Sequence, residues 1–189
     1  MAYENCLDYL RLRGIFPGTV APFCPVDNLI LSVCAYVPWE EAVPTLRDGD
    51  WLPFPQAVEA LTSHPDWDAV GLIMPKDTPT LVVEAARSPR FRPLALGCRE
   101  HVQDENTQFA ALTYRLPDGT LYLAFRGTDD SLAGWKECFA LSYTTVPAQK
   151  LAQEYLIQVA RRYPGKLRVG GHSKGGHTDP CRLPQSQPQ

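Results

Sequence analysis

The chain has 189 residues, of which 44 % are hydrophobic and 21 % charged, with a formal net charge of −3. This is the balance of an ordinary globular protein with a core of its own, so the composition excludes a disordered or fibrous chain. Lysine and arginine form no run or stripe, so nucleic acid is not expected as a partner.

Targeting signals and metal-binding patterns are both missing from the sequence. No basic stretch precedes an apolar one at the N-terminus, and no run of about 18 apolar residues occurs anywhere. We therefore expect no transmembrane segment and a cytoplasmic location. The cysteines form no C-x-x-C pair and match no zinc-ligand spacing, so we expect free thiols, no metal and no cofactor. They are Cys6, Cys24, Cys34, Cys98, Cys138 and Cys181.

Prolines punctuate the first half of the chain, which predicts a mainly helical and loop-rich part over residues 1–105. Asp27 and Asn28 precede an apolar run, which predicts a capped and largely buried helix ending before Pro38. Two further helices are predicted from proline at the first turn, with a strand as the alternative for part of the second. Their ranges are 55–61 and 78–87, and the strand alternative covers 81–83.

Hydrophobic periodicity in the second half predicts a hairpin followed by a crossover. Residues 107–115 and 121–125 read as strands around a Pro-Asp-Gly turn, and the second strand reads as more buried and more central. Residues 148–163 predict a helix with one apolar face, made of Leu151, Tyr155, Ile157, Val159 and Arg162. Residues 166–170 predict a strand parallel to the one before that helix. The expected fold class is α/β.

The segment Gly171-His172-Ser173-Lys174-Gly175 follows that strand directly and reads as a serine nucleophile elbow. Such a tight turn from strand to helix needs small residues two positions before and two after the serine. The helix that follows directs backbone N–H groups at the place where negative charge develops. A glycine-rich turn with a surface serine is the plain alternative, while a phosphate loop is disfavoured because no G-K-[ST] follows.

A second element, Phe125-Arg126-Gly127-Thr128, comes where a buried strand ends, at the edge at which open α/β sheets place their sites. A Gly-Thr pair there can supply a backbone N–H to an oxyanion. Arg126 can pair with one of two following aspartates, at positions 129 and 130, and so pin the loop. An ordinary strand-to-loop turn with a surface ion pair is the alternative.

These motifs resemble the lipase-like α/β-hydrolases related to the class 3 lipases and, more closely, the bacterial Mbeg1-like family. The resemblance rests on D-N-L-I-L-S with a following Y-V at 27–37, on the F-R-G-T-D-D-S block at 125–139 and on G-H-S-K-G-G at 171–176. It implies the N-terminal part of an α/β-hydrolase fold over residues 1–176. It implies Ser173 as the nucleophile, with Thr128 and the Lys174 backbone N–H as oxyanion donors. Position 138 is Cys where the family has Asp.

The family continues beyond Gly176 as an apolar helix, whereas residues 177–189 are polar and proline-rich. A helix is not expected there, and the acid and base of the triad, which follow the serine in this fold, are not recognisable. A local base formed by His177 and Asp179 would need an unsupported reversal of the chain. A metal cluster fits no standard spacing; its members would be His172, His177, Asp179 and Cys181. His172 is expected to be structural, and His64 and His101 to be solvated.

Three hypotheses follow. The first is a lipase-like or esterase-like serine acyl hydrolase, with a small acyl-ester or lipid-like substrate, of which this chain is a truncated and inactive form with an incomplete sheet and a disordered tail. The second is a non-catalytic binding or interaction protein that retains the front half of the fold. The third is a defective gene product. In each case an exposed sheet edge favours self-association.

Overall fold

The computed structural model describes residues 5–69, 74–105, 107–127, 146–173 and 175–176. These residues form a mixed α/β structure around a five-stranded sheet with the strand order β1-β2-β3-β4-β5. The β1–β2, β2–β3 and β3–β4 pairs are antiparallel, and β5 runs parallel to β4. The strands are β1 (Trp51–Pro53), β2 (Ala95–Gln103), β3 (Gln108–Arg115), β4 (Leu121–Phe125) and β5 (Leu167–Gly171).

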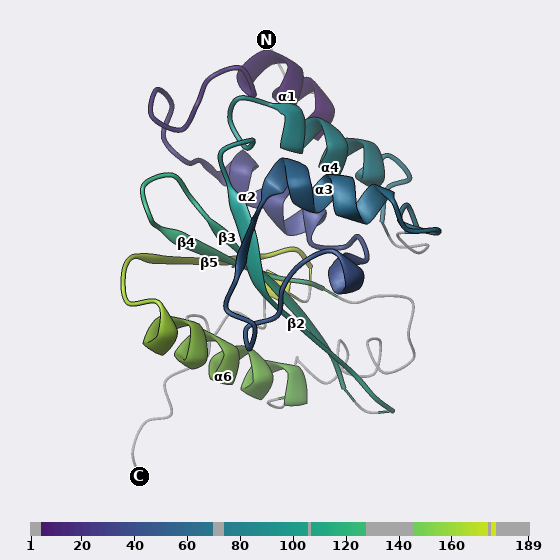
Figure 1. The fold of residues 1–189 in the computed structure, drawn as a ribbon, viewed down its shortest axis with the longest axis vertical. Helices are drawn as coiled ribbons and strands as arrows, with labels where there is room; N and C mark the ends of the chain where they lie inside the picture. The colour runs from purple at the N-terminus through teal and green to yellow at the C-terminus, as the bar shows by residue number, and fades with distance from the viewer. Residues whose placement is uncertain (1–4, 70–73, 106, 128–145, 174, 177–189) are drawn as a thin grey trace.

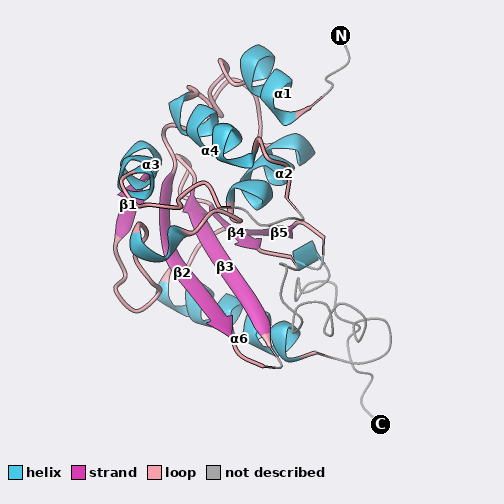
Figure 2. Cartoon of the chain, turned by 90° about the vertical axis from the view of Figure 1, so that its right-hand side faces the viewer, coloured by secondary structure: helices cyan, strands magenta, loops and turns pink. Residues whose placement is uncertain are grey.

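Helices cover both faces of this sheet, as Figure 1 shows. One face carries α1 (Cys6–Arg13), α2 (Pro25–Cys34), α3 (Phe54–Thr62), α4 (Thr78–Arg87) and the short 3₁₀ helix η1 (Trp39–Glu41). The other face carries α6 (Pro147–Arg162), which lies behind β2 and β3 in the view of Figure 2. Each face has its own core: Leu112 and Tyr122 belong to the first, and Leu123 and Phe125 to the second.

The predicted hairpin and crossover are confirmed. β3 and β4 pair in register, with Thr113 opposite Leu123, and α6 joins β4 to a parallel β5. The expectation that the second hairpin strand is the more central one was wrong, because β3 is the middle strand of the sheet. Both strands have helices on both sides, so both are buried along almost their whole length. On α6, Ile157 is 41 % exposed and lies outside the apolar face on which it was expected.

The helices predicted in the first half are confirmed, with one shift of boundary. α3 and α4 begin with proline in the first turn, and the 81–83 segment is helical. α2 begins at Pro25, so Asp27 lies inside its first turn and does not form the cap. The Asp27 carboxylate instead accepts a hydrogen bond from the backbone N–H of Cys24, at 2.8 Å, which closes the helix N-terminus from within.

Strands β1 and β2 were not identified from the sequence. β2 carries a bulge between Gly97 and Glu100, where the register against β3 shifts by one residue. Cys98 lies in this bulge with a φ of +52°, a left-handed conformation that non-glycine residues seldom adopt. The extra residue interrupts the alternation of apolar and polar side chains, and this removed the signal on which strand prediction depends.

Every helix in the described ranges is too short or too polar to cross a membrane.

Candidate active site

Ser173 lies on a sharp turn between β5 and a helical start at residues 175–176. Its φ is +56°, and its side chain is exposed. Two short backbone hydrogen bonds close the turn, from Gly175 N to His172 O and from Gly176 N to Ser173 O, both at 3.0 Å. A non-glycine residue held at positive φ stores strain, so the surrounding structure must impose this conformation. The described residues therefore show a strand that ends in a sharp turn at Ser173.

The two glycines that flank the serine are required by close backbone contacts. A Cβ on Gly171 would lie 2.4 Å from the carbonyl carbon of Gly175. A Cβ on Gly175 would lie 2.1 Å from the carbonyl oxygen of Phe125, at the end of β4. Real Cβ atoms do not approach backbone so closely, and backbone cannot move aside as a flexible side chain can. The elbow is thus pressed against the end of the neighbouring strand.

The loop that follows β4 lies directly beside the serine. A Cβ on Gly127 would lie 2.5 Å from the carbonyl oxygen of His172 and 3.0 Å from the Cβ of Ser173. The Gly127 carbonyl accepts a hydrogen bond from Gln108 Nε2 at 3.2 Å, which fixes the loop to β3. The two expected oxyanion donors, Thr128 and Lys174, lie outside the described residues.

Tyr36, just beyond the end of α2, joins this loop to the elbow, and sequence reasoning had assigned it no role at the site. Its hydroxyl accepts a hydrogen bond from Gly127 N at 2.9 Å and contacts His172 Nδ1 at 3.2 Å. The Tyr36 and His172 rings also meet edge to face, with their centroids 5.7 Å apart. The Tyr36 side chain is buried, so these contacts form in a medium that strengthens them. Tyr36 therefore holds the loop after β4 and the turn at Ser173 together.

His172 is half-buried, and its ring contacts Tyr36; the expectation that it is structural stays a prediction. Burial lowers the pKa of its imidazole, because a charged ring would lose hydration there. The neutral ring can accept a hydrogen bond from Tyr36 at Nδ1, which leaves the hydrogen on Nε2.

A polar stripe on α2 explains why that helix lies so close to β5. Asn28, Ser32 and Tyr36 recur every fourth residue and face the sheet. The Tyr122 hydroxyl is 2.8 Å from both Asn28 Oδ1 and Ser32 Oγ. A Cβ on Gly170 would lie 2.0 Å from Asn28 Oδ1, so a larger residue on β5 at this point would have to displace the Asn28 side chain. Polar residues at a spacing of four in an apolar helix were the signal that could have revealed this contact.

Arg126, in the loop after β4, contacts His101, a histidine that we expected to be solvated. His101 on β2 has one ring nitrogen, Nε2, 3.4 Å from Arg126 Nη2. The other, Nδ1, is 2.8 Å from Glu40 Oε1. The expectation of a solvated His101 was wrong, because the loop after α2 brings Glu40 over the sheet. Burial favours a higher pKa for Glu40, but hydrogen bonding to His101 and the charges nearby hold its pKa below the ordinary value.

Other sequence-based expectations can be placed briefly. His64 is exposed, as predicted. The four described cysteines, Cys6, Cys24, Cys34 and Cys98, are free thiols. In the described part of the chain, no three His, Cys, Asp or Glu side chains gather closely enough to hold a metal ion. Several residues weighed as candidates lie outside the described ranges: Asp129, Asp130, Cys138, His177, Asp179 and Cys181.

The fold and site together define a mixed α/β protein whose parallel edge strand ends in a strained, exposed serine turn. The sequence model of the Mbeg1-like family matches residues 65–181, which is more than half of the chain. The chain therefore belongs to the Mbeg1-like family. No curated protein and no solved structure matches it.

Proposed function

We propose that Ser173 is the nucleophile of a lipase-like or esterase-like acyl hydrolase site. The observation that carries this proposal is the positive φ of an exposed serine between a parallel strand and a helical turn. This backbone conformation lifts a serine hydroxyl out of the turn, where an acyl carbon can approach it. Asp66 and Cys98 also have a positive φ, but of these three residues only Ser173 directly follows a parallel strand.

The packing around the serine also suits stabilisation of an oxyanion. Gly127 lies against Ser173, and Thr128 is the next residue in the sequence. The Gly127 N–H is engaged by Tyr36, so Gly127 itself is not the donor. We therefore retain the backbone N–H groups of Thr128 and Lys174 as the proposed oxyanion donors. The substrate class is a small acyl ester or a lipid-like ester.

Activation of Ser173 as a nucleophile requires a base within hydrogen-bonding reach of its hydroxyl. Among the described residues, no hydrogen bond joins Ser173 Oγ to an imidazole, and His172 directs Nδ1 at Tyr36. A serine hydroxyl without a base is a weak nucleophile, although an elbow and an oxyanion hole retain some residual reactivity. The expectation that this chain is inactive on its own stays a prediction.

Incubation of the purified chain with p-nitrophenyl butyrate separates acylation from turnover. Intact-protein mass spectrometry should show one added butyryl group, which peptide mapping places on Ser173 and which Ser173→Ala lacks. Release of p-nitrophenol after the first equivalent should equal that of Ser173→Ala. If neither protein becomes acylated, or another residue carries the group, the proposed function fails. If turnover depends on Ser173, the expectation of inactivity fails and the proposed function stands.

A further inference from the structure

A pocket lies at the end of β4 and β5 that is opposite to the serine. It is a pocket of about 360 Å³, within the range of small-molecule sites, which run from about 300 to 1,000 Å³. The turn at 116–118 precedes β4 and Arg168 lies near the start of β5, whereas Ser173 follows the end of β5. The pocket is therefore separate from the candidate active site. Most of its wall is apolar, including Pro17, Pro22, Phe23, Phe91, Leu94 and Leu116.

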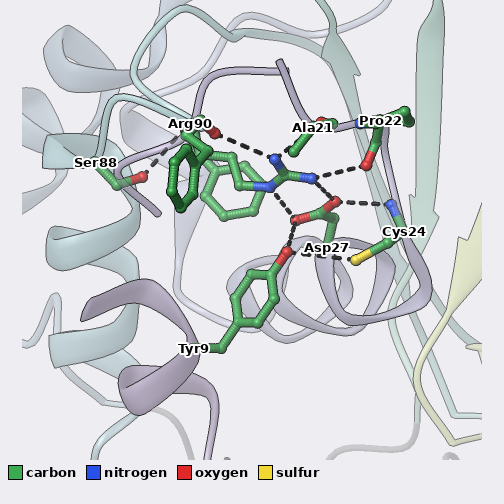
Figure 3. A network of polar contacts seen from close by, with 9 residues as sticks. Tyr9, Ala21, Pro22, Cys24, Asp27, Ser88 and Arg90 are labelled. Carbon is green, nitrogen blue, oxygen red and sulfur yellow. Dashed lines mark hydrogen bonds and ion pairs between the residues drawn. The ribbon is translucent and has the colours of Figure 1, made fainter. Parts of the chain in front are cut away.

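The wall formed by residues 17–23 is held in place by one buried guanidinium, as Figure 3 shows. Arg90 donates to the carbonyl oxygens of Phe16, Ala21 and Pro22 at 3.0–3.2 Å. It also forms a two-pronged ion pair with Asp27, whose carboxylate accepts from Tyr9 as well. Arg90 and Asp27 are almost fully buried, at 4 % and 1 % side-chain exposure. The loop is thus fixed by its backbone, and its apolar side chains are free to line the pocket.

Every N–H group of the Arg90 guanidinium already has an acceptor within this network. The five N–H donors of a guanidinium are matched by five contacts at Arg90. Arg90 therefore supports the wall without being available to a ligand. A ligand would have to find its polar contact at the rim of the pocket.

Arg168 offers a polar group of this kind at the rim of the pocket. Its side chain is exposed, and its guanidinium carbon lies 5.3 Å from the centre of the Phe23 ring. Stacking on an aromatic face leaves the N–H edge of a guanidinium open for a planar anion. In the described part of the chain, Arg168 forms no ion pair within 4 Å. Among the described residues, Asp118 places a carboxylate at the rim of the same pocket; its Oδ1 accepts from Thr120 N at 2.9 Å, and its pKa is lowered by hydrogen bonds to Thr120 and by the charges of Lys166 and Arg168.

A smaller hollow of about 230 Å³ shares Phe23 and Arg168 with the larger one. Its wall continues along β5 to Val169, next to Tyr122 and Asn28. Arg168 therefore stands between two hollows, where it can meet the head group of a molecule whose body lies in the larger one.

We propose that the larger pocket binds a small amphipathic monocarboxylate, with its apolar body between the 17–23 loop and the turn at 116–118 and its carboxylate on Arg168. The apolar wall favours an alkyl or aryl body through burial. The exposed arginine selects a carboxylate over a neutral head group, because a charged pair adds to what burial alone provides. This inference does not rest on the proposed function, since Ser173 takes no part in it.

Calorimetric titration with octanoate and with 1-octanol tests the proposal. Octanoate should bind at one site and more tightly than octanol. Arg168→Gln should weaken octanoate by about tenfold, the size of one charge-assisted hydrogen bond, and leave octanol unchanged. Arg161→Gln, which removes an exposed arginine from α6, should change neither. Equal octanoate affinity in Arg168→Gln and in the unaltered chain would overturn the assignment of the carboxylate.

A pocket-filling variant tests the apolar part independently. Gly18 lines the pocket, and a Cβ on it would meet no heavy atom within 4 Å, so Gly18→Trp should fold and is expected to obstruct the pocket. Its far-ultraviolet circular dichroism and melting temperature should match those of the unaltered chain, while both ligands lose binding. Ser173→Ala should bind octanoate with unchanged affinity. Octanoate binding that survives Gly18→Trp would place the ligand elsewhere and overturn the proposal.

Discussion

The two ends of α2 use buried polar groups in different ways. At its start, Asp27 and Arg90 form an ion pair in which each donor and acceptor finds a partner within the network. Just past its end, Tyr36 connects Gly127 and His172 and thereby holds an exposed serine in a strained conformation. The first arrangement fixes a loop, and the second fixes the turn that carries Ser173. The Asp27–Arg90 network anchors the start of α2. Tyr36, just past the end of that helix, then constrains the turn at Ser173.

This comparison predicts its largest effect for the ion pair. Arg90→Met removes one partner and leaves the Asp27 carboxylate buried, together with the carbonyl groups of the loop. The free energy of unfolding should fall by about 3–5 kcal/mol, as for other broken buried pairs. Urea denaturation monitored by circular dichroism measures it. Arg87→Met, on the exposed surface of α4, is the control and should change stability by less than about 0.5 kcal/mol.

The elbow glycine should give the next largest effect. Gly175→Ala forces a methyl group to within 2.1 Å of the Phe125 carbonyl oxygen, so the turn or β4 has to move. Overpacking of this kind costs about 2–3 kcal/mol. Gly18→Ala is the matched control, because its methyl group meets open space. Equal stabilities of the two alanine variants would contradict the close packing of elbow and strand.

Tyr36→Phe tests the contact that joins the two halves of the site. It leaves the Gly127 N–H without its partner, which should cost about 1–2 kcal/mol. Tyr114→Phe removes a buried hydroxyl bonded to the Leu31 carbonyl and should cost a similar amount. Only Tyr36→Phe should also slow acylation of Ser173. If both variants slow acylation equally, Tyr36 acts through stability alone.

His172 should give the smallest effect, visible as a dependence on pH. Burial holds its pKa in the folded chain below the ordinary value of about 6.5, so the unfolded chain binds the proton more readily. Its contribution to stability is therefore fully present above about pH 6.5 and is lost as the pH falls through the lower, folded value. His172→Gln should flatten the fall in unfolding free energy between about pH 7 and 5. An unchanged slope would show that the ring is not held neutral.

The sequence predicted the second half of the fold well, because its signals are local. The hairpin, α6 and β5 follow from turn residues and periodicity, and the elbow follows from the glycines around Ser173. β2 was not predicted because a bulge at Cys98 interrupts its alternation of apolar and polar side chains. The contacts of Tyr36 and His101 were not predicted for another reason. They join residues 136 and 25 positions apart in the chain, and only tertiary packing decides which polar groups meet.

Site-resolved labelling with a fluorophosphonate tests most directly whether Ser173 is a nucleophile. Ser63 provides an internal reference, since it is exposed but has an ordinary φ of −80°. Peptide mapping after a time course should find the phosphonate on Ser173 and not on Ser63, and Ser173→Ala should remove it. Labelling of the two serines at equal rates, or labelling that persists in Ser173→Ala, would contradict the account.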